Sequence, residues 1–286
     1  MPRRPAVAGT FYEANEAELL GDLERCFCGD FGPGRLPEAP EHRIGNVIGL
    51  VSPHAGYIYS GGAAAFAYLA LAEDGLPDTV VMLGPNHYGM GAPVAVSPDE
   101  AWTTPLGTLA RDDETAREIA RLCGFAREDE LPHLREHSIE VQLPFLQFVG
   151  GSQVRIVAIS IAHLSLRDAI EAASELGAAM ASALKGKSAA IIASTDLSHY
   201  ESQARADAQD SLAIEQMLRL DGHGLLETVY SRDITMCGAI GTAAMIEAAK
   251  ILGATQAQQL VHYTSGDVTG DTRQVVGYGA IRVEKG

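Results

Sequence analysis

One short stretch constrains the fold of this chain more than any other. The apolar run over 47–51 ends at once in the polar turn Ser52-Pro53-His54-Ala55-Gly56, and an alanine-rich segment follows at 63–65. An apolar run without alternating polar residues is typical of a strand that is covered on both faces. The small side chains after the turn suit a helix that packs closely on a sheet. We therefore predict a strand over 45–52 and a helix over 61–73.

This order of buried strand, turn and helix recurs along the chain. Three more buried strands are predicted over 78–84, 154–161 and 188–194, and a hairpin-like excursion is expected over 93–111. Further helices are predicted over 113–122, 139–148, 165–184, 204–220, 224–230 and 238–252. Strands that alternate with helices are typical of an α/β fold with a mostly parallel central sheet and helices on both faces.

The two ends of the chain depart from this alternation. Residues 1–44 are expected to form an irregular lead-in that packs on the body and contains one helix over 16–26. The last two strands, over 258–265 and 274–283, are expected to be antiparallel or to lie at an edge of the sheet. Because we find neither a later linker nor an internal repeat, we predict a single domain over 1–286.

Composition argues against several classes of protein. The 286 residues are 47% hydrophobic and carry a formal net charge of −16, from 21 basic and 37 acidic residues. Such a chain can bury a sizeable core, whereas its acidic surface repels nucleic acid and anionic lipid. Four cysteines do not make a disulfide framework at this length, and no apolar segment indicates a secretory signal or a membrane span. We expect a cytoplasmic protein with reduced thiols and no nucleic-acid or membrane partner.

Reactive side chains stand just past the ends of the four predicted buried strands. His54 follows the first strand, His87 the second and His163 the third, while Asp196 and His199 follow the fourth. Ligands of open α/β sheets bind at the carboxyl ends of the strands, where these side chains can converge. A single histidine after a strand is more often a structural loop residue. Four such strand ends together favour a shared site.

Two other residues are candidates because of their local setting. His137 shares a polar loop with Glu136, so it could enter the site as a proton carrier or simply lie near the start of the next helix. Cys237 precedes a predicted helix start at Gly238. A helix N-terminus lowers the pKa of a thiol and favours the thiolate, which is the form that binds metal. The alternative for Cys237 is a small buried core residue.

The remaining histidines and cysteines lack such a setting. We expect Cys123 to pack inside a helix, and we interpret Cys26 and Cys28 as incidental thiols beside an exposed loop. Surface or packing roles are expected for His42, His223 and His262.

Two histidines and one cysteine would suit a borderline transition metal ion. Imidazole fits Fe, Cu or Zn, and a thiolate shifts the preference toward Cu or Zn. Three protein ligands with open positions are typical of a reactive metal site, beside which Asp196 and His199 could support the ligands or act as acid and base. The chain contains no dinucleotide fingerprint, no Walker lysine motif and no G-x-S-x-G, so nucleotide-binding and serine-hydrolase functions are disfavoured.

Six motifs that follow one another over nearly the whole chain carry a family resemblance. They are Ala8-Gly9-Thr10-Phe11-Tyr12, Pro53-His54-Ala55-Gly56-Tyr57, Gly84-Pro85-Asn86-His87, Glu136-His137-Ser138-Ile139-Glu140, Ser194-Thr195-Asp196-Leu197-Ser198-His199-Tyr200 and Cys237-Gly238. Together these motifs resemble the Memo family, whose prokaryotic members are named as protein B of the AmmeMemoRadiSam system. The fold of that family is similar to the class III, LigB-type extradiol dioxygenases, which are non-haem iron enzymes.

The resemblance implies a specific assignment of the site. His54, His87 and Cys237 would be the metal ligands, for iron or copper, in a pocket that also contains His199 and Asp196. From the residues themselves, zinc is a further option, and we predict His199, Asp196 and His137 as the catalytic residues. A cysteine stands where the dioxygenases carry a carboxylate, and a thiolate is itself oxidisable.

Three functions therefore remain open from the sequence. The first is a metal-dependent redox enzyme related to extradiol dioxygenases. The second is a non-catalytic protein that binds a peptide or a metal and works with AMMECR-type and radical-SAM partners. The third, a zinc hydrolase, is less favoured.

Overall fold

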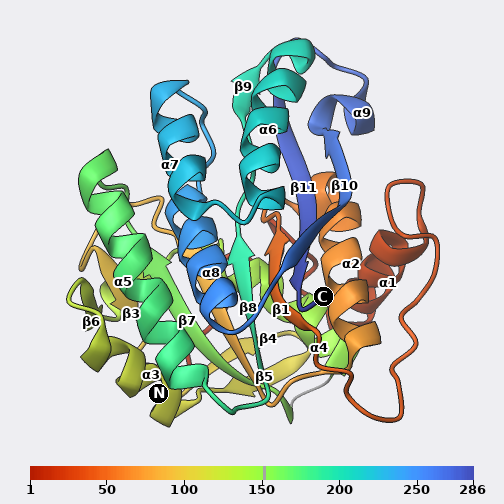
Figure 1. Ribbon diagram of the computed structural model, residues 1–286. Coiled ribbons are helices and arrows are strands. Elements are labelled where there is room, and N and C mark those ends of the chain that lie inside the picture. Colours follow the sequence, from red (N-terminus) through yellow and green to blue (C-terminus); the bar gives the residue numbers. More distant parts are fainter. Residues whose placement is uncertain (151–152) are drawn as a thin grey trace.

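A nine-stranded sheet forms the centre of the computed structural model, which describes residues 1–150 and 153–286 (Figure 1). The strands of this sheet are β1 (Val47–Ser52), β2 (Thr79–Pro85), β3 (Val94–Val96), β6 (Ala126–Glu128), β7 (Arg155–Ile161), β8 (Ala189–Ser194), β9 (His199–Glu201), β10 (Gln256–Thr264) and β11 (Val275–Glu284). Their spatial order is β10-β11-β1-β8-β2-β7-β3-β6, and β9 pairs with β11.

The four central strands are parallel, so their carboxyl ends share one edge. β8 lies between β1 and β2, with Ser194 beside Ser52 and Ala193 beside Leu83. β2 in turn pairs with β7 in parallel. These strands are buried along almost their whole length, as apolar runs without alternation require. Antiparallel strands flank this core, since β11 pairs with β1 on one side and β3 pairs with β7 on the other.

Helices cover both faces of the sheet and divide the interior into two apolar cores. One face carries α1 (Glu16–Cys28), α2 (Tyr57–Asp74) and α4 (Leu143–Gly150). The other carries α3 (Asp113–Leu122), α5 (Leu166–Leu184), α6 (Gln203–Leu218), α7 (Gly222–Ser231) and α8 (Ala239–Ile251), of which α5, α7 and α8 stand in front of the sheet in Figure 1. A β-carbon at Gly49 would lie 2.3 Å from Met245 Sδ, so this glycine lets α8 pack closely on β1.

The fold confirms the prediction of a single α/β domain with parallel central strands and helices on both faces. The predicted buried strands correspond to β1, β2, β7 and β8, and the last two strands are antiparallel at one edge. The hairpin prediction was partly wrong. β4 (Ala101–Thr104) and β5 (Gly107–Ala110) form a separate hairpin, but the backbone of β3 pairs with the end of β7 in the main sheet, where its apolar side chains are buried.

Other differences concern short elements. The helix predicted over 61–73 begins earlier, at Tyr57, and the one predicted over 139–148 starts as the 3₁₀ helix η2 (Glu140–Gln142) before α4. The short elements β6, β9, η1 (Leu131–His133) and α9 (Ser265–Thr269) were not predicted, since three to five residues carry no readable periodicity.

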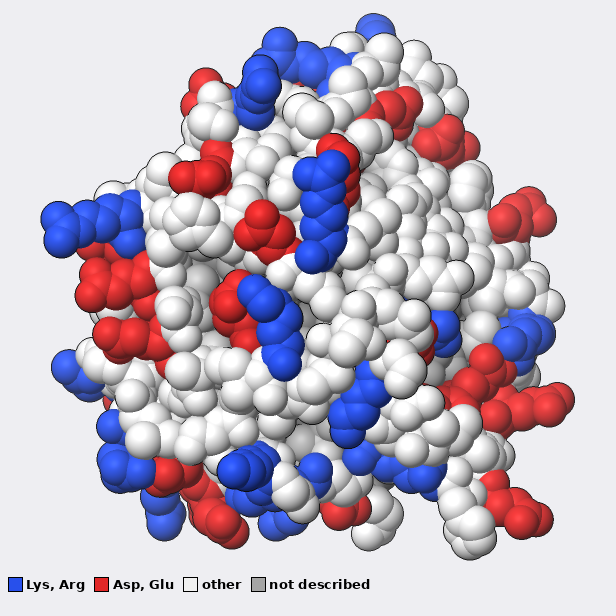
Figure 2. Space-filling model, in the orientation of Figure 1, with Lys and Arg blue, Asp and Glu red and all other residues white. Residues whose placement is uncertain are grey.

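The surface carries mixed charge on the face drawn in Figure 2. Acidic and basic side chains are interspersed there and do not gather into one patch of either sign. No helix of the described residues is long and apolar enough to cross a membrane.

Candidate metal site

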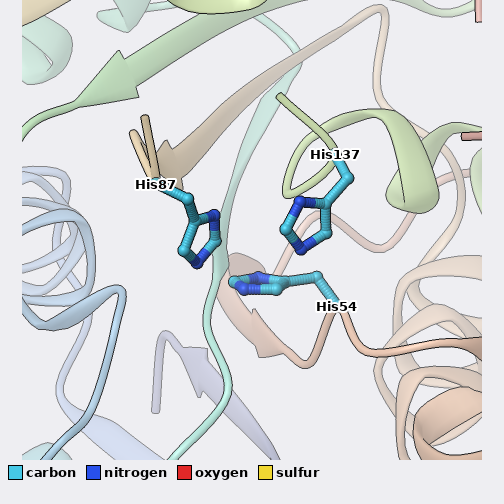
Figure 3. Close-up of side chains that lie close together, drawn as sticks. All are labelled: His54, His87 and His137. Carbon is cyan, nitrogen blue, oxygen red and sulfur yellow. The ribbon is translucent and has the colours of Figure 1, made fainter. Parts of the chain in front are cut away.

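Three histidines from three separate segments meet at the carboxyl edge of the sheet. His54 lies two residues past β1, His87 two residues past β2, and His137 in the loop between η1 and η2. One ring nitrogen of each lies within 4.8 Å of one ring nitrogen of each of the others, and Figure 3 shows the three rings facing a common space. The sequence therefore predicted correctly that His54 and His87 converge, and the structure adds His137 to the same cluster.

Hydrogen bonds determine which ring nitrogen of His54 can bind a ligand. Its Nδ1 lies 2.9 Å from Ser194 Oγ. That hydroxyl donates its own proton to the Ser138 carbonyl at 2.6 Å, so it accepts from His54. His54 is then the tautomer with a proton on Nδ1 and a lone pair on Nε2. Gln142 Nε2 donates to the same hydroxyl at 2.8 Å and to the Pro53 carbonyl, which braces the turn that carries His54.

One buried carboxylate fixes His87 Nδ1 in the same way and lies beside His137 Nδ1. Glu136 Oε1 accepts from His87 Nδ1 at 2.9 Å and lies 3.2 Å from His137 Nδ1. The same carboxylate accepts the backbone N–H groups of His87, His137 and Ser138. Each ring therefore turns Nε2 away from the carboxylate. A histidine whose Nδ1–H is held by an acceptor is the usual arrangement of a metal ligand, so this donor set fits a transition metal ion.

The pKa shifts agree with neutral, ligand-competent rings at two of the three positions. Burial, together with the neighbouring His137 and His87, holds the pKa of His54 well below its usual value. Burial also lowers the pKa of His137. For His87 burial acts in the same direction, but the contact with Glu136 outweighs it and raises the pKa. Burial would raise the pKa of Glu136, yet the bond from His87 and the nearby His137 lower it to about 2, so the carboxylate is ionised at neutral pH.

Cys237 reaches the cluster through His54. Its Sγ lies 3.3 Å from His54 Nε2 and accepts the backbone N–H of Asp196 at 3.3 Å. The sequence suggested that the helix start would lower the pKa of this thiol. Instead burial raises the pKa, and the Asp196 carboxylate adds to the rise, because both disfavour a second negative charge. A cation beside the sulfur would act in the opposite direction.

Asp196 lies beside the cluster on the loop after β8, and His199 is the first residue of β9. Asp196 Oδ1 accepts the backbone N–H of His54 at 2.7 Å, and burial raises the pKa of this carboxyl against the opposing effect of His199. His199 Nδ1 lies 2.9 Å from the Leu197 carbonyl and 2.8 Å from the Thr235 carbonyl, so it donates and leaves a lone pair on Nε2. Both residues line the cavity of about 930 Å³ onto which His54, His87, His137 and Cys237 also open.

Two parts of the site were missed by the sequence interpretation. Ser194 is the last residue of β8, and the sequence placed it at the end of a strand and in a family motif without giving its side chain a role in the site. Phe11, in the N-terminal lead-in, lines the cavity, and its ring centroid lies 4.5 Å from that of His137. Local sequence carries little signal for either role, because both depend on contacts with residues more than fifty positions away.

The other histidines and cysteines lie outside the cluster. The exposed His163 stacks on Tyr230, with ring centroids 5.7 Å apart. The packing roles expected for His262 and Cys123 are confirmed, since His262 Nε2 lies 2.9 Å from Asp210 Oδ2 and Cys123 is buried in the core. Cys26 is buried, whereas Cys28 is exposed.

The fold and the cluster define an α/β protein with a candidate metal site at the carboxyl edge of parallel strands. A family model described as Memo-like protein matches residues 3–282. The chain therefore belongs to the Memo family, and the resemblance inferred from its motifs is confirmed.

Individual relatives support this membership over the full length. A MEMO1 family protein of Methanopyrus kandleri is 46% identical over 288 residues, which cover 100% of both chains. One of Thermotoga maritima is 45% identical over 97% of this chain and 98% of its own. The crystal structure of an uncharacterized protein from Escherichia coli K12 matches with a TM-score of 0.58 and 11% identity, covering 83% of this chain and 99% of that one. At this identity the match shows the fold alone.

Proposed function

We propose that this chain binds a single iron or copper ion through His54 and His87 and uses it in a redox reaction related to that of the extradiol dioxygenases. The observation that carries the proposal is the set of three imidazoles whose ring nitrogens lie within 4.8 Å of one another, each with Nδ1 turned to an oxygen. His137 and Cys237 are the two candidates for a third ligand. Imidazole and thiolate both suit these ions.

Such an ion, when bound, would supply one-electron chemistry and polarise a coordinated oxygen atom. The protein residues have separate tasks. Glu136 and Ser194 hold the ligand tautomers, and Asp196 holds the backbone of His54. His199 is held through Nδ1 and turns Nε2 to the cavity of about 930 Å³, where Nε2 can exchange a proton with a bound substrate.

The test is the metal content of protein purified anaerobically without chelator. We expect close to one equivalent of metal in the wild type, and at least about a tenfold loss of affinity in His54→Ala and His87→Ala. His137→Ala and Cys237→Ser are compared beside them, and the variant with the larger loss identifies the third ligand. His163→Ala, which removes an exposed histidine outside the cluster, is the matched control. Full metal content in both His54→Ala and His87→Ala would refute the site.

A second candidate function is a non-catalytic peptide-binding adaptor. It is favoured by the aromatic side chains Tyr59 and Tyr200, which are 41% and 74% exposed and line the same wide cavity. AMMECR-type and radical-SAM proteins would then carry out the chemistry. Co-purification with either partner that persists in His54→Ala but is lost in Tyr200→Ala would support this function, and no association with either would count against it.

A further inference from the structure

A second cavity of about 520 Å³ opens beside the histidine cluster. It lies between the carboxyl ends of β2 and β7 and the segment that joins α7 to α8. Its buried walls are apolar and include Ile161, Val229, Ile234, Met236 and Ile240. The cavity shares His87, Thr235 and Cys237 with the wider cavity of about 930 Å³. Two side chains of the candidate metal site therefore face both spaces.

An aromatic pair marks the mouth of this second cavity. The rings of His163 and Tyr230 both line it and stack within 11° of parallel. The Tyr230 hydroxyl donates to the Leu164 carbonyl at 2.8 Å, which fixes the ring. His163 is a strand-end histidine that lies outside the metal cluster. Its position in the lining suits contact with a ligand of this cavity and not with the metal, because aromatic side chains favour flat apolar ligands.

The charges that line the cavity restrict its occupant further. Among its lining residues there is no lysine or arginine, and Asp233 is the one carboxylate. Asp233 is exposed, and no ion pair involves it within the described part of the chain. A phosphate or carboxylate would find no lysine or arginine among these lining residues, whereas the Asp233 carboxylate would favour an uncharged or positively charged group.

We propose that this second cavity binds a planar, apolar small molecule or side group without negative charge, and that its inner end reaches the metal centre past His87 and Cys237. The pocket itself follows from its volume, its apolar walls and the His163–Tyr230 pair. Only the approach to the metal rests on the function proposed above. The cavity would thus hold the apolar part of a substrate whose reacting group lies in the wider cavity.

The experiment uses three probes with one ring system and different charges: indole, tryptamine and indole-3-acetate. Each is titrated by calorimetry into the protein as purified, and the metal content of the same sample is measured. We expect indole and tryptamine to bind and indole-3-acetate to bind more weakly. His163→Ala should weaken indole binding by about 2- to 12-fold, the range for loss of one aromatic contact. Asp233→Asn should remove any advantage of tryptamine over indole.

Two further variants separate this cavity from its neighbour. Ala162→Phe places a ring at the half-buried wall of the second cavity and should abolish indole binding. Tyr200→Ala alters only the rim of the wider cavity and should leave indole binding unchanged. No binding of indole, unchanged binding in His163→Ala, or loss in Tyr200→Ala would each overturn the proposal. Binding that depends on His163 in protein without metal would uphold the cavity while the metal-dependent function fails.

Discussion

Glu136 accepts two hydrogen bonds from His87, one from the backbone N–H at 2.7 Å and one from ring Nδ1 at 2.9 Å. The carboxylate thus fixes the main chain and the side chain of one histidine together. It also accepts the backbone N–H groups at 137 and 138, so one buried residue aligns two segments of the site. Each of these partners is an N–H donor. Glu136 can bind all of them because an ionised carboxylate accepts hydrogen bonds and donates none.

The first prediction concerns Glu136→Gln. The amide would place an NH₂ group against N–H donors, so at least one ring loses its orientation. We expect the affinity for Zn²⁺ or Co²⁺ to fall by about 10- to 100-fold, the usual cost of losing a partner of a ligating histidine. Competition with a chromophoric chelator measures it. Glu130→Gln, at an exposed residue just before η1, is the control. Equal affinities in the two variants would show that the carboxylate does not orient the ligands.

The second prediction contrasts two buried serines near the carboxyl ends of β8 and β7, the two strands that flank β2. Ser194→Ala leaves His54 Nδ1 without its acceptor and Gln142 Nε2 without one of its two, and it should destabilise the fold by about 1–3 kcal/mol. Ser160→Ala removes a buried hydroxyl that has no partner in the described structure, so its effect should be neutral or slightly stabilising. Urea unfolding of both variants measures the free energies. A larger loss in Ser160→Ala would contradict the hydrogen bonding described here.

The third prediction concerns the buried ion pair of the N-terminal segment. Arg3 Nη1 lies 2.7 Å from Glu140 Oε2, and the same carboxylate accepts the Tyr12 hydroxyl and the backbone N–H groups of Ala6 and Val7. Arg3→Met would leave Glu140 buried without its cation, at a cost of about 3–5 kcal/mol.

The control for Arg3→Met is an ion pair at the surface. Arg273 contacts Asp271 in solvent, and Arg273→Met should have little effect on stability because water screens an exposed ion pair. Thermal unfolding of both variants gives the comparison. Similar losses would mean that Arg3 does not anchor the segment that brings Phe11 to the site.

The fourth prediction concerns pH. Burial would raise the pKa of Asp112, but hydrogen bonds from the Thr79 hydroxyl and from Thr115 outweigh it and lower the pKa. A carboxylate whose pKa is lower in the folded state stabilises the fold above its unfolded pKa of about 3.9 and loses that contribution as the pH falls through the folded pKa. The stability difference between wild type and Asp112→Asn should therefore shrink below about pH 4. Melting temperatures of both proteins from pH 7 to 3 test this, and a constant difference would contradict it.

The parts of the fold that the sequence predicted are those with a strong local signal. The apolar run before His54 and the amphipathic helix over 113–122 carry their periodicity in consecutive residues. β3 was misplaced because three apolar residues pair equally well in a hairpin or in a sheet. The order of strands, in which β8 separates β1 from β2, depends on packing between distant segments.

In the site, as in the fold, the residues with a strong local signal were the ones that the sequence predicted. His54 and His87 stand directly after strong strands, so their convergence followed from the rule for parallel sheets. His137 lies in a loop without periodicity, and only its contact with Glu136 places it in the cluster. The relative placement of His137 and Cys237 depends on where two loops and a helix start meet, which residue spacing does not encode. The choice between them as third ligand stays a prediction.

The position of β8 between β1 and β2 has a consequence for the newly made chain. His54, His87 and His137 all precede residue 189, where β8 begins, yet β8 sets the spacing of the first two and supplies Ser194 to His54. Synthesis proceeds from the N-terminus, so all three histidines leave the ribosome well before β8, the strand that separates β1 from β2. A nascent or truncated chain that ends before Ser194 would contain all three histidines of the cluster but would bind metal weakly. We therefore expect metal to bind only after most of the polypeptide has been synthesised.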